Sequence, residues 1–133
     1  MKLDPIPAVV RQLLRDHIES YEHLECLLLL GRTHPRSWAV DEVASELHSG
    51  PSIVAEALEH LHRAGLVQTS TTGGPQQFTY TAGPDLIETL WHAYATNRLE
   101  IMSLMTANSL DRVSTSALRR FASAFFLRRK NDG

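Results

Sequence analysis

The chain has 133 residues, of which 43% are hydrophobic and 21% charged, and its formal net charge is −2. This length and composition suit one compact domain, spanning residues 1–133, and exclude two independent ones. No stretch approaches the roughly 20 consecutive apolar residues of a membrane span, and the N-terminus lacks the basic and apolar regions of a signal peptide. We therefore expect a cytoplasmic protein with no membrane partner.

Residues 1–35 predict two helices. Apolar residues recur at helical spacing over 7–18, which indicates the first helix. Ser20 is a suitable N-cap for a second helix over Tyr21–Leu30, and Gly31 is expected to close it.

Residues 36–82 predict two further helices followed by a β-hairpin. The first helix is Val40–Leu47, which ends at the residues His48-Ser49-Gly50. The second begins at Pro51, with Ser49 or Ser52 as its cap, and ends at Gly65. Two short segments rich in β-branched and aromatic residues, 66–69 and 77–80, flank a turn at 71–75 and predict the hairpin.

Residues 84–133 predict two C-terminal helices. Gly83-Pro84-Asp85 is a helix start signal, and an apolar stripe continues from there to about Ala107. A last helix is expected over about 116–127. Because a stripe of this length exceeds what one small domain can cover, we expect both helices to form a homodimer interface, with the contacts made by Leu86, Leu90, Trp91, Tyr94, Ile101, Met105, Phe121 and Phe125.

The run LEHLHRAGLV, which closes a helix and leads into the hairpin, resembles the winged helix-turn-helix superfamily, in particular bacterial regulators of the MarR and ArsR kind. The resemblance covers roughly residues 20–82. It implies a mainly α fold with a small β-hairpin wing (α+β), a short third strand at Trp38, appended C-terminal dimerisation helices, and a DNA-binding transcriptional regulator. The helix after Pro51 would then lie in the major groove, and the residues expected at double-stranded DNA are Ser52, Ile53, Ala55, Glu56, Glu59, His60, Arg63, Arg32 and Arg36.

The charge distribution favours an alternative function. Residues 22–82 hold three basic and seven acidic side chains, and residues 64–97 have no lysine or arginine, although phosphate contacts dominate affinity for duplex DNA. The basic side chains concentrate instead in residues 110–133, with six against two acidic ones. A winged-helix module that binds a protein partner through its acidic face or its C-terminal helices is therefore the second hypothesis.

Catalytic and metal sites are not expected. The sequence lacks a glycine-rich phosphate loop, a nucleophile elbow and a Cys-rich zinc pattern, so no enzyme and no cofactor is predicted. Glu56 and His60 are four residues apart, but with seven histidines in the chain such pairs arise by chance, and no metal site is predicted. Cys26 cannot form an internal disulfide and, within a leucine run, is expected to be a buried thiol.

Overall fold

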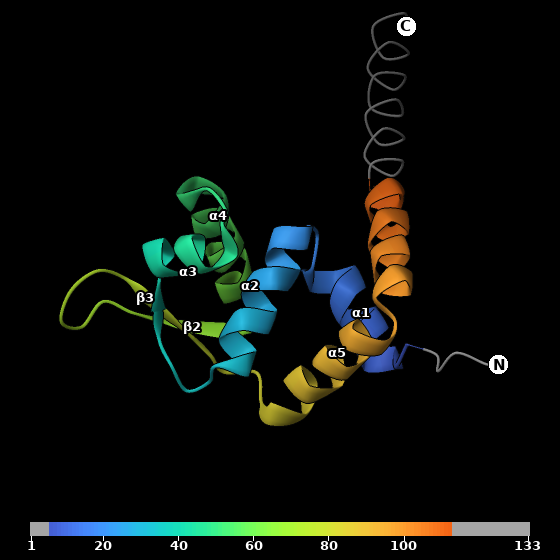
Figure 1. The fold of residues 1–133 in the computed structure, drawn as a ribbon, viewed down its shortest axis with the longest axis horizontal. Coiled ribbons are helices and arrows are strands. Elements are labelled where there is room, and N and C mark those ends of the chain that lie inside the picture. Colours follow the sequence, from blue (N-terminus) through green and yellow to red (C-terminus); the bar gives the residue numbers. More distant parts are fainter. Residues whose placement is uncertain (1–5, 113–133) are drawn as a thin grey trace, which may run out of the picture.

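The computed structural model describes residues 6–112 of the chain (Figure 1). Its elements, in chain order, are α1 (Ala8–His17), α2 (Tyr21–Arg32), β1 (Trp38–Ala39), α3 (Val40–Leu47), α4 (Pro51–Arg63), β2 (Val67–Ser70), β3 (Gln77–Tyr80) and α5 (Pro84–Thr96). A further helix covers residues 98–112. Within residues 6–112, no helix is long and apolar enough to cross a membrane.

Helix α2 is the centre of the fold. It packs against α4 and β3 on the side of the hairpin and against α5 on the other side. Leu24, Leu27 and Leu30 of this helix are completely buried. The hairpin and the helix 98–112 lie at opposite ends of the molecule (Figure 1), so one core supports two projecting elements.

The sheet is small and antiparallel, with the strand order β1-β3-β2. Trp38 pairs with Phe78, and Val67 pairs with Tyr80. Phe78 and Tyr80 alternate with half-exposed residues along β3 and are each 1% exposed, as expected for a strand with one face on the core. The third strand predicted at Trp38 is thus present, and the strand predicted over 66–69 lies one residue further on.

Several local signals act as predicted. The Ser20 hydroxyl oxygen accepts a hydrogen bond from the backbone N–H of His23 at 3.1 Å, which caps α2. Gly65 follows α4 with a φ of 80°, and α5 begins at Pro84. The cap of α4 was predicted wrongly: Gly50 is the N-cap residue, and no side chain caps that helix.

Gly31 does not close α2 but lies inside it, since the helix continues to Arg32. A Cβ atom built at this residue would lie 2.2 Å from Ile87 Cγ1 of α5. The missing side chain therefore lets α2 and α5 approach each other closely, a reason that the sequence pattern did not contain.

The single long helix predicted from Pro84 to about Ala107 is also wrong, because the chain breaks at Asn97, whose φ and ψ are −132° and 43°. The backbone carbonyl of Asn97 accepts from the N–H of Ile101 at 3.0 Å, which starts the next helix. Asparagine side chains compete with the helical backbone for hydrogen bonds and favour helix ends. The helix 98–112 consequently leaves α5 in a new direction (Figure 1). The last helix predicted over 116–127 lies outside the described residues.

Candidate nucleic-acid interface

The two helices α3 and α4 meet at a tight turn. His48 ends α3 in the left-handed conformation, with a φ of 54°, and the N–H of Ser49 donates to the carbonyl of Ala44 at 3.0 Å. Gly50 is the N-cap residue of α4, and Pro51 is its first residue. The turn leaves the N-terminal end of α4 at the surface, where Pro51 and Ser52 are exposed.

Helix α4 has one buried and one open face. Val54, Ala57, Leu58 and Leu61 are 0% exposed and hold the helix on the core. Ser52, Ile53 and Arg63 are exposed on the outside, and Ala55 is half-buried. Ile53 is 50% exposed.

The acidic side chains of α4 are engaged within the chain. A carboxylate oxygen of Glu56 accepts from Nε2 of His23 at 3.1 Å. A carboxylate oxygen of Glu59 accepts from the amide of Gln76 in the wing at 3.4 Å. His60, predicted at the DNA, contacts the carbonyl of His17 through Nε2 and stacks on His23. Glu56 and His60 are therefore directed at α2, while Glu59 faces the hairpin.

The three arginines predicted to grip phosphate have different surroundings. The guanidinium of Arg32 lies over the ring of Trp91 of α5, at 3.9 Å from its centroid. That of Arg36 lies 3.6 Å from the centroid of Trp38 and pairs with Glu42 at 3.5 Å. Arg63 is exposed at the last turn of α4 and forms no ion pair within residues 6–112. Of the three, Arg63 has the charge most available to a ligand.

The residues predicted for dimerisation divide into three groups. Leu90, Ile101 and Met105 are at most 9% exposed within the single chain, so the assignment of these three to a dimer surface needs correction. The side chains of Leu90, Ile101 and Met105 belong to the chain's own core, because the helix breaks at Asn97 and the residues after it pack against that core. Leu86, Trp91 and Tyr94 are half-buried or exposed. Phe121 and Phe125 lie outside the described residues.

Two leucines missed by that prediction are more exposed. Leu99 is 84% and Leu110 63% exposed, both on the helix 98–112. Eleven residues correspond to about three full turns, so both lie on one side of this helix, opposite buried Ile101. They are two of the five large apolar side chains that remain exposed within residues 6–112.

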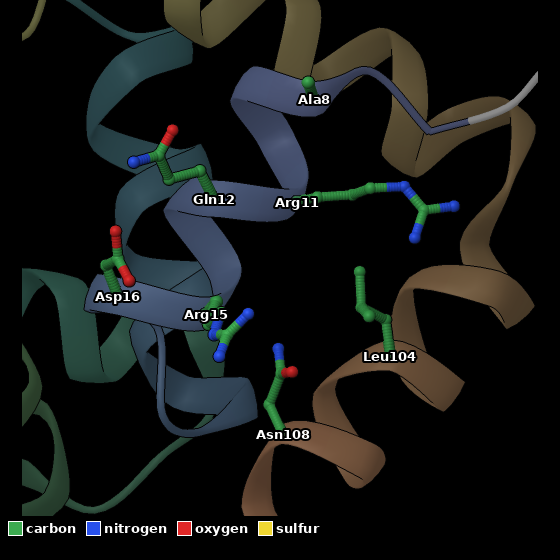
Figure 2. Close-up of a pocket in the computed structure, with 7 residues that line it drawn as sticks. All are labelled: Ala8, Arg11, Gln12, Arg15, Asp16, Leu104 and Asn108. Carbon is green, nitrogen blue, oxygen red and sulfur yellow. The ribbon is translucent and has the colours of Figure 1, made fainter.

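A cavity of about 610 Å³ lies between α1 and the helix 98–112. Arg11 and Arg15 reach from α1 toward the gap, and Asn108 faces them from the other helix (Figure 2). The amide nitrogen of Asn108 is buried and, among the described residues, has no hydrogen-bond partner. The rest of the lining is Ala8, Gln12, Asp16 and Leu104. Arg11 already donates to the backbone carbonyl of Ile6 at 3.2 Å.

Cys26 is 0% exposed, as predicted. Burial, followed by the negative charges of Glu25 and Glu22, raises the pKa of its thiol to about 12. Since the thiolate is the reactive form, we expect iodoacetamide at pH 8 to modify Cys26 in the folded protein about 1000-fold more slowly than in urea. A mass-spectrometric time course measures both rates. Equal rates in the two conditions would contradict a buried, inert thiol.

Solved structures share this architecture. HlyU from Vibrio cholerae is 19% identical and superposes with a TM-score of 0.52 over 68% of this chain and 90% of its own. The transcriptional repressor BigR from Xylella fastidiosa is 15% identical, with a TM-score of 0.51 over 67% of this chain and 84% of its own. MepR, a transcription regulator of the Staphylococcus aureus multidrug efflux pump MepA, is 15% identical, with a TM-score of 0.52 over 86% of this chain and 90% of its own.

The chain has the winged helix-turn-helix fold. In this fold α3 and α4 form the helix-turn-helix, and β2 and β3 form the wing. HlyU and BigR are of the ArsR kind and MepR is of the MarR kind, so the fold that the sequence resemblance implied is confirmed. No protein-family model matches the chain, and neither does any curated protein. At these identities the likeness concerns the fold.

Proposed function

We propose that this protein is a transcriptional regulator that binds duplex DNA as a homodimer, with α4 in the major groove and the wing beside it. The observation that carries the proposal is the open outer face of α4. Ser52 and Ile53 are exposed at its N-terminal end, and Arg63 is exposed at its last turn. A hydroxyl can bond to base edges, and an apolar side chain can contact the methyl group of thymine.

The positive end of the α4 dipole lies at the exposed turn, where it favours a phosphate group. Glu56 and Glu59 each accept a hydrogen bond within the chain, from His23 and Gln76. They keep their negative charge, and the Glu56 side chain is 62% exposed, so these two groups oppose phosphate contacts on their side of α4. The second half of the interface would come from a second copy, which binds through Leu99 and Leu110.

A second candidate function is binding to another protein. The observation that favours it is the charge count: residues 22–82 hold three basic and seven acidic side chains. The exposed part of the wing, residues 71–76, has no basic side chain. In that case the acidic helix-turn-helix would meet a basic partner surface.

Binding to a pool of genomic duplex fragments across a salt series tests the two functions. We expect the wild-type protein to select a sequence, with affinity that falls as salt rises. Arg63→Ala should raise the Kd about tenfold and make the slope of log K against log salt shallower by about 1.

Arg98→Ala is the matched control. This arginine is also exposed, but it lies in the helix 98–112, where it donates to Tyr21, and its loss should change the Kd less than about twofold. No wild-type binding at low salt would reject the DNA-binding function. Affinity purification with a tagged protein would then be the experiment that tests the second candidate.

A further inference from the structure

The hydrogen-bonded cluster on the α2 side of α4 consists of His23, Glu56 and His60. Glu56 and His60 are four residues apart on α4, so their side chains lie on one face of the helix. His23 comes from α2 and is 3% exposed. One ring nitrogen of each histidine and one carboxylate oxygen of Glu56 all lie within 4.8 Å of one another.

We propose that these three side chains form a binding site for a divalent transition-metal ion of the zinc class, which ties α4 to α2. Two imidazoles and one carboxylate are a donor set that suits Zn²⁺ and Co²⁺, with a water molecule as the fourth ligand. The site stands independently of DNA binding.

The spacing of the donors is close to what the ion needs. In a tetrahedral site with bonds of about 2.0–2.1 Å, neighbouring donors lie about 3.3 Å apart. His23 Nε2 and Glu56 Oε2 are 3.1 Å apart. The rings of His23 and His60 are stacked, with centroids 4.0 Å apart and planes at 14°. Stacked rings cannot direct their in-plane lone pairs at one ion, so metal binding requires the more exposed ring, His60, to turn out of the stack until both ring planes contain the ion.

His60 already has the second interaction that metal-bound histidines use. Its Nε2 contacts the backbone carbonyl of His17. Because a carbonyl can only accept, this nitrogen carries the hydrogen and Nδ1 has its lone pair available. Metal-ligating histidines typically donate their other N–H to a carbonyl or carboxylate, which orients the ring.

His23 requires a change of tautomer. Its Nδ1 accepts from the backbone N–H of Glu19 at 3.2 Å, so in the metal-free protein Nε2 carries the hydrogen and donates to Glu56. Metal binding moves this hydrogen to Nδ1, which breaks the bond with Glu19 and leaves two N–H groups facing each other beside a ring that is 3% exposed. An unpaired buried N–H group costs free energy, so the bonds to the ion must outweigh this change.

The charge around the cluster favours a cation. Within residues 6–112, no lysine or arginine pairs with Glu56. The two imidazoles and the carboxylate therefore meet beside a helix-turn-helix rich in acidic side chains. A metal ion would take the place of the hydrogen that His23 Nε2 donates to Glu56. Such an ion would supply the positive charge that the cluster lacks.

Isothermal titration of the full-length, chelator-treated protein with ZnCl₂ tests the proposal. We expect one Zn²⁺ per chain in wild type, and a Kd raised at least tenfold in Glu56→Gln and in His60→Gln. Both variants leave buried His23 in place, and circular dichroism verifies their fold. CoCl₂ should give the visible absorption of four-coordinate cobalt with wild type and lose it with His60→Gln.

Two variants serve as controls. Glu59→Gln removes a carboxylate from the same helix, and His92→Gln removes an exposed histidine of α5; both should bind zinc as wild type does. The proposal is overturned if wild type takes up no zinc in a saturable way. It is equally overturned if zinc binds the Glu56 and His60 variants with unchanged affinity, since the ion would then lie on other surface histidines.

Discussion

The double substitution Leu99→Glu and Leu110→Glu is expected to leave the protein monomeric and to weaken its binding to duplex DNA by about 100-fold or more. Both leucines lie on the outer side of the helix 98–112, at 84% and 63% exposure. Carboxylates there cannot be buried against a second copy without a large desolvation cost. The folded monomer should persist, because neither side chain belongs to the core.

Sedimentation equilibrium of the variant and wild type measures the change, together with duplex binding at one salt concentration. Ser109→Glu is the control: it adds a carboxylate at an exposed residue of the same helix, about a quarter of a turn from the two leucines. It should remain dimeric. A wild-type protein that is monomeric at all concentrations, or a double variant that still dimerises, would show that the leucines are not the interface.

Gly31→Ala is expected to lower the free energy of unfolding by about 1–3 kcal/mol, although alanine is the better helix former by about 1 kcal/mol. The added Cβ would lie 2.2 Å from Cγ1 and 2.3 Å from Cδ1 of Ile87. A new rotamer of Ile87 could move these two atoms, but its own Cβ would remain at 3.1 Å. Helices α2 and α5 must therefore separate slightly.

Urea denaturation of a double-mutant cycle with Ile87→Ala tests the cause. If the steric contact is responsible, the double variant should be more stable than the sum of the two single effects predicts, by about 1 kcal/mol or more. Additive effects would mean that Gly31→Ala acts in another way, for example on the unfolded chain. A stabilising Gly31→Ala would contradict the close approach of α2 and α5 altogether.

Local chemistry explains why much of the fold was predictable. Ser20 caps α2, Pro84 begins α5 and Gly65 follows α4, because each effect depends on hydrogen bonds or backbone angles within a few residues. Where two local signals compete, prediction failed. The apolar spacing across Asn97 suggested one helix, yet the hydrogen-bonding tendency of that residue broke it, and this changed which leucines are buried.

The candidate sites were less predictable, since they depend on partners far away in the chain. The resemblance to winged helix-turn-helix regulators implied that Ser52, Ile53 and Arg63 lie at the DNA, and all three are exposed on α4. The sequence pattern did not indicate that His60 and Glu56 would turn toward His23, 33 residues before Glu56. Nor did it indicate that Arg36 would lie on Trp38 and pair with Glu42.

The sequence by itself determined the helices as far as Thr96, the hairpin and the winged helix-turn-helix order, because apolar periodicity and capping residues act locally. The tertiary structure alone decided that His23, Glu56 and His60 meet, that Gly31 lies against Ile87, and that Leu99 and Leu110 remain exposed. These contacts depend on the angle and distance between packed helices. Many residues set that geometry together, so no single helix contains it in its own pattern.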